Sequence, residues 1–176
     1  YVNENTIPYS LILEAVQQVI AQPGKYRVPF NYGGPEGSGN LIASIRKYHL
    51  QNGSGGLTEE VLDRLRIIVG PSGAASLLGG AAHVRRRGIV VTSDPMYYIY
   101  CNVLERMGFE VITVAEDASG MSTDLLRERL DQLGERCRDI SFFYIVSVNN
   151  PTATILSNER RREIVETAAG LSRNQQ

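Results

Sequence analysis

Residues 89–114, IVVTSDPMYYIYCNVLERMGFEVITV, predict a strand, a helix and a second strand in direct succession. The segments IVVTS at 89–93 and FEVITV at 109–114 are rich in β-branched residues, which favour strands. Between them we expect a helix with Pro95 at its first position, where proline is well tolerated, and with its end at Gly108. Strands that alternate with helices of this length are typical of a parallel sheet with covered faces.

The same alternation continues on both sides of this stretch. The β-branched run RIIVG predicts a buried strand at 66–70, and ISFFYIVSV predicts another at 140–148. We expect one helix with an apolar stripe over 74–82 and another that is capped by Ser122 or Thr123. A last helix should begin at Ser157, with Ile164, Val165 and Ala168 pointing inward. We therefore predict an α/β fold with a mainly parallel sheet and helices on both faces.

A helical segment precedes this sheet. Apolar residues recur at helical spacing over 12–20 and 41–48, on either side of the Gly-rich stretch NYGGPEGSGN at 31–40. Thr58, followed by Glu59 and Glu60, has the features of a helix N-cap. We expect residues 1–56 to form an N-terminal helical segment and residues 57–176 to form the first, incomplete part of a larger sheet domain.

Composition excludes several classes of function. The 176 residues are 43% hydrophobic and carry a formal net charge of −1, so no global positive field favours nucleic acid or an anionic membrane. No apolar run approaches the roughly 18 residues that a spanning helix needs. Cys101 and Cys137 show no metal-ligand spacing with the two histidines and suit a reducing compartment. We expect a cytoplasmic protein with no metal site.

Three loops should meet at one edge of the sheet, because each follows a predicted strand and ligands bind at the carboxyl ends of parallel strands. GPSGAA at 70–75 offers free backbone N–H groups for a phosphate, although a tight turn alone would have this composition. SDPMYY at 93–98 brings tyrosine rings for stacking, or merely for packing over a helix start. In VNNPTATILS at 148–157, Asn149 or Asn150 precedes Pro151, as a ligand-facing amide or as a turn opener.

The order of these motifs carries a resemblance to a known family. YGGPEGSGNLIASIRKYH (32–49), IIVGPSGAASLL (67–78), SDPMYY and NNPTATILSNERRREIV (149–165) resemble successive motifs of the fold-type I, class I/II aminotransferases. These enzymes use pyridoxal 5′-phosphate, and the similarity is greatest to their 2-aminoadipate and kynurenine aminotransferase branch. The resemblance implies transfer of an amino group from an amino acid to a 2-oxo acid.

The resemblance also implies roles for individual residues. Tyr97 would stack on the pyridine ring of the cofactor, and Asn150 would donate a hydrogen bond to its 3′-oxygen. The cofactor phosphate would lie on the backbone N–H groups of Gly73, Ala74 and Ala75. Tyr32 would reach the site of a neighbouring subunit, which implies a homodimer. Ala153 departs from the family pattern, which has Gly at a position that favours a positive φ.

No catalytic residue is assigned within the chain. The family forms a Schiff base between the cofactor and a lysine, and the two lysines here, Lys25 and Lys47, match no such motif. We expect the chain to be the N-terminal part of an aminotransferase and to be inactive alone, without a stable covalent link to the cofactor. The alternatives are an inactive aminotransferase-like binding or assembly module, or another fold-type I enzyme such as a lyase or decarboxylase.

Overall fold

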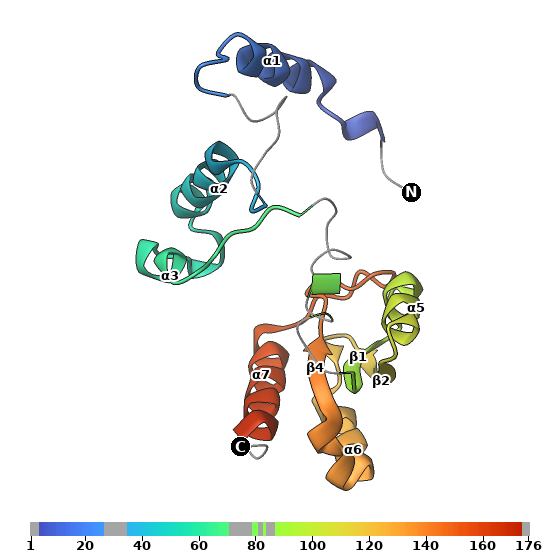
Figure 1. The fold of residues 1–176 in the computed structure, drawn as a ribbon. Coiled ribbons are helices and arrows are strands. Elements are labelled where there is room, and N and C mark those ends of the chain that lie inside the picture. The colour runs from blue at the N-terminus through green and yellow to red at the C-terminus, as the bar shows by residue number, and fades with distance from the viewer. Residues whose placement is uncertain (1–3, 27–34, 71–78, 81–82, 84–86, 174–176) are drawn as a thin grey trace. The chain divides into compact units, whose positions relative to one another are not determined.

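The structure of the chain is a computed structural model that describes residues 4–26, 35–70, 79–80, 83 and 87–173 (Figure 1). The chain divides into two compact units, Tyr1–Pro71 and Ser72–Gln176. The boundary between these units falls later than the boundary expected after Gly56. The assignment of 57–176 to one sheet domain stays a prediction.

The first unit is helical, as predicted. Its elements are the 3₁₀ turns η1 (Glu4–Thr6) and η3 (Ser54–Gly56) and the helices α1 (Tyr9–Ile20), α2 (Gly39–Asn52) and α3 (Glu59–Asp63). Thr58 caps α3, because its side chain accepts a hydrogen bond from the Val61 N–H at 3.3 Å. Arg46 joins α2 to α3 by donating to the Leu62 carbonyl at 2.8 Å and pairing with Asp63 at 2.5 Å.

The strand predicted at 66–70 is wrong. These residues form no strand and lie in the first unit, where Val69 N–H donates to the Glu36 carbonyl at 2.9 Å and Ile68 is 60% exposed. A strand forms only where a neighbouring strand satisfies its backbone groups. The β-branched composition of this segment favours an extended backbone but cannot supply that partner.

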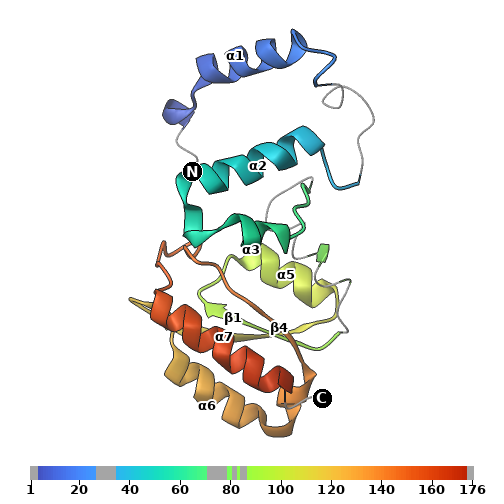
Figure 2. The ribbon, with the colours of Figure 1, turned by 90° about the vertical axis from the view of Figure 1, so that its left-hand side faces the viewer.

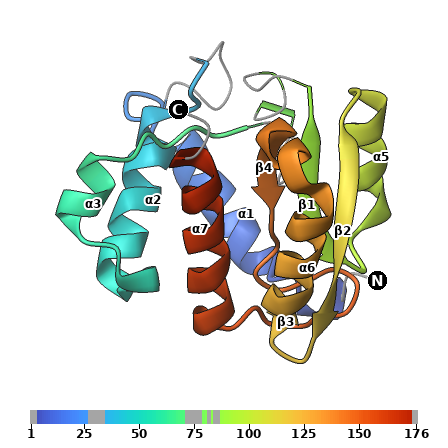
Figure 3. The ribbon, with the colours of Figure 1, turned by 90° about the horizontal axis from the view of Figure 1, so that it is seen from below.

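The second unit contains a four-stranded sheet. Its strands are β1 (Ile89–Asp94), β2 (Glu110–Asp117), β3 (Gly120–Met121) and β4 (Ile140–Tyr144). They lie in the order β3-β2-β1-β4, and Figure 3 shows β1 between β2 and β4. β1 pairs in parallel with both β2 and β4, whereas β3 folds back antiparallel onto the end of β2. The prediction of a mainly parallel sheet is confirmed.

Helices cover both faces of this sheet, again as predicted. α5 (Tyr98–Arg106) lies on one side, and α6 (Thr123–Leu133) and α7 (Asn158–Arg173) lie on the other (Figure 2). Successive strand residues point to opposite faces, so Val90 packs with Leu104 of α5 while Val91 packs toward α6 and α7. A short 3₁₀ segment, η4 (Gly134–Asp139), leads from α6 into β4.

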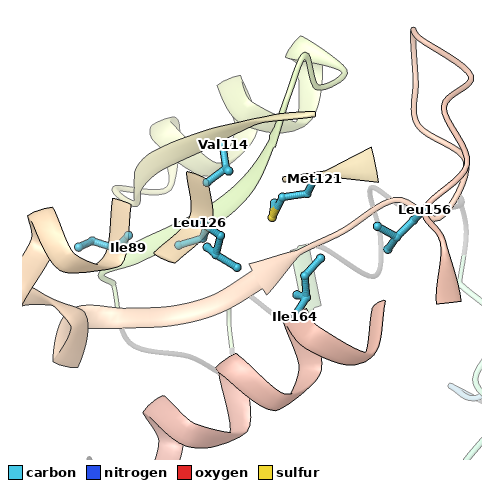
Figure 4. Packing of buried hydrophobic residues seen from close by; sticks show 7 residues of the cluster. Ile89, Val114, Met121, Leu126, Leu156 and Ile164 are labelled. Atoms are coloured by element: carbon cyan, nitrogen blue, oxygen red, sulfur yellow. The ribbon is translucent and has the colours of Figure 1, made fainter. Parts of the chain in front are cut away.

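The larger core cluster lies between the sheet and the pair α6 and α7 (Figure 4). Its buried members are Ile89, Val91, Val114, Met121, Leu126, Leu156 and Ile164. Leu156 is the member that comes from the loop after β4, and it is 4% exposed. The core therefore fixes the far end of that loop, which carries the motif Asn149–Asn150–Pro151.

The helix starts predicted in this unit are confirmed where a side chain caps its own helix. Ser122 caps α6 by accepting from Leu125 N–H at 3.4 Å, and Ser157 accepts from Arg160 N–H at 3.2 Å at the start of α7. Val165, expected to point inward, is 62% exposed, because the buried residue of α7 is Ile164.

Predicted boundaries are wrong at α5, at β4 and at β2, which continues past Val114 to Asp117. The helix expected to start at Pro95 starts at Tyr98, since the Pro95 carbonyl accepts a hydrogen bond from the side chain of Asn149 instead of from a helical N–H. β4 ends at Tyr144, where its register with β1 stops at Thr92. The helix expected over 74–82 lies largely outside the described residues. None of the helices in the described part of the chain combines the length and apolar character needed to cross a membrane.

Candidate functional site

The candidate site lies at the carboxyl edge of the parallel sheet. β1 ends at Asp94 and β4 at Tyr144, and both strands run in the same direction. The segment 95–97 that follows β1 and the segment 145–157 that follows β4 therefore leave the sheet at the same edge. Crevices at such an edge are the usual ligand sites of α/β sheets.

The second of these segments forms a narrow loop that closes on itself. Val148 and Ile155 form an antiparallel bridge, and Asn149 N–H donates to the Thr154 carbonyl at 2.9 Å. Ala153 N–H donates back to the Asn149 carbonyl at 2.8 Å. Asn150 lies within this closed turn and is exposed, so its amide is free to meet a ligand.

Ala153 takes the unusual backbone conformation anticipated from its sequence position. Its φ is +60°, the left-handed region that glycine tolerates and a Cβ atom resists. The fold holds this conformation through the hydrogen bond from Ala153 N–H to Asn149. The replacement of glycine by alanine thus leaves the turn formed at the cost of local strain.

Asn149 joins the two loops. Its side chain is 5% exposed, and its Nδ2 atom donates to the Pro95 carbonyl at 2.7 Å and to Glu116 Oε2 at 2.8 Å. The other carboxylate oxygen, Glu116 Oε1, accepts from Thr154 Oγ1 at 3.1 Å. One buried amide and one carboxylate from β2 thereby connect the segments that follow β1 and β4.

Tyr97 stands at the start of α5 within a group of aromatic rings. Its ring centroid lies 5.2 Å from that of Tyr100 in an edge-to-face arrangement, and Tyr100 in turn lies 5.8 Å from Tyr144. Burial, with Tyr100 and Cys101 nearby, raises the pKa of Tyr144 to about 12, and its hydroxyl has no hydrogen-bond partner. Edge-to-face packing of this kind fixes the plane of the half-buried Tyr97 ring.

The predicted site residues divide into those described and those not. Tyr97 and Asn150 lie on the two loops that Asn149 connects, so the structure brings their segments together. Tyr32, Gly73, Ala74 and Ala75 lie outside the described residues, and their predicted roles stay predictions. The lysines, at 25 and 47, both belong to the first unit.

Sequence reasoning missed Glu116 and left Asn149 as an alternative to Asn150. The predicted strand stopped at Val114, whereas β2 continues to Asp117 and carries Glu116 to the edge. Ala115, Glu116 and Asp117 show no apolar–polar alternation that could have extended the predicted strand. No sequence pattern indicates that Asn149 is the buried amide of the pair.

Other features of the described residues point elsewhere. A cavity of about 260 Å³ lies on the α6 side of β1 and β2, with Asp94, Thr113 and Arg129 in its lining, but it includes neither Tyr97 nor Asn150. Among the described residues, no three His, Cys, Asp or Glu side chains gather as metal ligands would. The aromatic ring and amide at the sheet edge suit a planar ring that accepts hydrogen bonds.

Comparison with known proteins places this chain in a family. The family model for aminotransferase class I and II matches residues 2–171. The mitochondrial kynurenine/alpha-aminoadipate aminotransferase of Bos taurus is 33% identical over 86 residues, 45% of this chain and 20% of the relative. An uncharacterised HTH-type transcriptional regulator, YisV of Bacillus subtilis, is 28% identical over 130 residues, 67% of this chain and 26% of the relative.

The fold matches a solved structure over nearly the whole chain. The kynurenine aminotransferase of Pyrococcus horikoshii, solved in complex with PMP, superposes with a TM-score of 0.82 at 21% identity. The match covers 97% of this chain and 41% of that one. The chain spans about a quarter or less of the curated relatives named above. The family match covers most of the sequence, and the chain belongs to the class I and II aminotransferase family.

Proposed function

We propose that this chain supplies one part of the pyridoxal 5′-phosphate site of an aminotransferase, which moves an amino group from an amino acid to a 2-oxo acid. The observation that carries the proposal is the Asn149 side chain, which ties the Tyr97 segment to the Asn150 segment at the sheet edge. Family membership over residues 2–171 supports the cofactor and the reaction class. The cofactor supplies an electron sink when bound, and the protein supplies binding and orientation.

Tyr97 and Asn150 have complementary tasks in this proposal. The Tyr97 ring, half-buried and packed edge-to-face on Tyr100, offers a fixed aromatic surface for the pyridine ring. The exposed Asn150 amide donates a hydrogen bond to the negatively charged 3′-oxygen, a bond stronger than one between neutral groups. Together the two contacts set the plane and the rotation of the cofactor.

The remaining predicted contacts complete the proposal. Backbone N–H groups of Gly73, Ala74 and Ala75 hold the phosphate, and Tyr32 reaches the site of a second copy in a homodimer. Residues 57–176 then form part of the cofactor-binding domain and 1–56 its helical N-terminal segment, in a cytoplasmic protein. Neither Lys25 nor Lys47 acts as the covalent lysine, and this chain alone is inactive.

A second candidate is a binding module without catalysis. The observation that favours it is the match to a relative described as a transcriptional regulator, which covers 67% of this chain. In this case the same sheet edge binds the cofactor or an amino acid, and binding rather than turnover is the output. The two candidates differ in one result: only the aminotransferase converts a 2-oxo acid to an amino acid.

Titration with the cofactor tests the proposal. Protein expressed from the natural gene should bind pyridoxal phosphate, measured by absorbance and fluorescence. Tyr97→Leu should weaken binding by about 2–10-fold through lost stacking. Asn150→Leu should weaken it by about 10-fold or more through a lost charged hydrogen bond.

Two matched variants serve as controls. Tyr48→Leu removes a ring on α2 that is 61% exposed, and Asn102→Leu removes an exposed amide on α5. Both should bind the cofactor as the wild type does. Equal losses in the control and site variants, or no binding by the wild type, would contradict the proposed site. Amino transfer to a 2-oxo acid then separates the enzyme from the binding module.

A further inference from the structure

We infer that Glu116 is a positioning residue: through Asn149 and Thr154 it holds the Tyr97 and Asn150 loops in register at the sheet edge. We call the hydrogen bonds of Glu116 with Asn149 and Thr154 the clamp. The effect of the clamp on cofactor binding rests on the proposed function, whereas the clamp itself is a property of the fold. Glu116 contacts neither Tyr97 nor Asn150 in the hydrogen bonds described, so it acts through its partners.

The Asn149 amide nitrogen is fully used. An asparagine Nδ2 atom carries two N–H donors, and here one meets the Pro95 carbonyl at 2.7 Å and the other meets Glu116 at 2.8 Å. Because the side chain is 5% exposed, water cannot readily replace either partner. Loss of the Glu116 acceptor would leave a buried donor unsatisfied.

The Glu116 carboxylate closes the base of the Asn150 loop from outside. Its two oxygens accept from Asn149 and Thr154, which also pair through their backbones at 2.9 Å. The residues between these two anchors include Asn150 and the strained Ala153. A carboxylate that accepts hydrogen bonds from both ends of a strained turn stabilises the turn against opening.

A side-chain hydrogen bond rather than strand pairing connects the two loops. The register of β1 with β4 ends at Thr92 and Tyr144, before either loop begins. Beyond that point the Asn149 amide provides the connection to Pro95, two residues before Tyr97. The separation between the Tyr97 ring and the Asn150 amide therefore depends on this amide and on the carboxylate that orients it.

Three variants separate hydrogen bonding from charge and from general destabilisation. Glu116→Leu removes both acceptors at similar size. Glu116→Gln can keep both contacts, because its amide oxygen can accept from Asn149 while its amide nitrogen donates to the Thr154 hydroxyl, which reverses the direction of that bond. Glu110→Leu is the matched control, a glutamate on the same strand whose carboxylate forms an exposed pair with Arg136.

Hydrogen exchange of the cofactor-free protein gives the first readout. Glu116→Leu should raise exchange by about tenfold in the peptide covering 148–155, where the Asn149 and Ala153 N–H groups are hydrogen-bonded, and in the peptide covering 95–101, where Tyr100 N–H donates to the Tyr97 carbonyl. Glu116→Gln and Glu110→Leu should leave both within about threefold of the wild type. If Glu116→Leu does not fold, Thr154→Val, which removes one donor to the carboxylate, should still raise exchange in 148–155. Unchanged exchange in either loop, or equal effects of Leu and Gln at 116, would overturn the inference.

Cofactor binding gives the second readout. Glu116→Leu should weaken pyridoxal phosphate binding by about tenfold, with Glu116→Gln close to the wild type. If the wild-type protein binds no cofactor, the proposed function is wrong, but the hydrogen-exchange result still tests the clamp. If the loops loosen in Glu116→Leu but its cofactor affinity equals that of the wild type, the positioning role is wrong.

Discussion

Both units of this chain contain helices, but the side chains of these helices are buried to very different extents in the two units. Among the residues described in Tyr1–Pro71, Leu62 is buried, whereas α1 and α2 contain no buried residue. In Ser72–Gln176 two clusters of buried side chains lie on opposite faces of one sheet. An amphipathic pattern therefore predicts that a helix forms, but not that a core within the same unit covers it.

α1 shows the difference most clearly. Its helical span contains the expected stripe, yet the stripe residues Ile12, Val16 and Ile20 are 49%, 45% and 57% exposed. Leu104 and Leu126, in helices of the second unit, are each 0% exposed. The second unit thus has a hydrophobic core of its own. Truncating side chains in the two units should therefore change the free energy of unfolding by different amounts.

The largest expected effect is the loss of a core side chain. Leu104→Ala should lower the free energy of unfolding by about 2–5 kcal/mol, because it removes a fully buried side chain and leaves a cavity. Ile12→Ala on α1, at 49% exposure, should change it by about 0.5 kcal/mol or less. Urea unfolding followed by circular dichroism measures both, and similar losses would show that the first unit has a core of its own.

A methyl group added at a glycine should have the next largest effect, and the free energy of unfolding should again respond differently in the two units. A Cβ atom on Gly88 would lie 2.3 Å from the Asp139 carbonyl oxygen, so Gly88→Ala should cost about 1–3 kcal/mol. At Gly39, the first residue of α2, nothing lies within 4 Å of that position. Gly39→Ala should be neutral or stabilise by up to about 1 kcal/mol. Equal thermal unfolding temperatures for the two variants would contradict the tight approach of β1 and β4 at Gly88.

The same contrast explains what the sequence could predict. Thr58, Ser122 and Ser157 accept hydrogen bonds from N–H groups three residues on, so the cap is encoded within one turn. A strand needs a partner distant in sequence. The run at 66–70 has strand composition but lies in the unit whose described residues form no sheet, while 89–93 pairs with strands on both sides.

The candidate site follows the same rule. Tyr97 and Asn150 could be predicted as candidate site residues because each follows a predicted strand and because the order of motifs resembles that of a family. Glu116 was missed because its partners lie at positions 149 and 154, and only the folded sheet brings them together. Asn149 was not separated from Asn150, since the two adjacent amides differ in burial and not in residue type.

The smallest effect concerns a buried hydroxyl in the second unit. The pKa of Tyr144 is raised to about 12, so the folded protein keeps this proton above the ordinary tyrosine pKa of about 10. The stability that Tyr144 contributes is therefore complete below pH 10 and is lost as pH rises toward 12. Tyr144→Phe should lack this loss, and at pH 7 it should be unchanged or up to about 1 kcal/mol more stable, because the hydroxyl has no partner.

Ile12→Ala in the first unit is the control for this titration. It removes no ionisable group at a position that is 49% exposed, so its stability should fall in parallel with that of the wild type between pH 10 and 12. Urea midpoints measured across this range give the comparison. A Tyr144→Phe profile parallel to that of the wild type would show that the hydroxyl titrates as freely in the folded protein as in the unfolded chain.

A structure of the protein with pyridoxal phosphate bound tests the central claim most directly. The claim is that the segments after β1 and β4, joined by Asn149, form one face of the cofactor site. The account predicts the pyridine ring against the Tyr97 ring, with the Asn150 amide donating to the 3′-oxygen and the Asn149 bonds to Pro95 and Glu116 intact. A cofactor bound away from this sheet edge, or bound there with Tyr97 and Asn150 both out of contact, would contradict it.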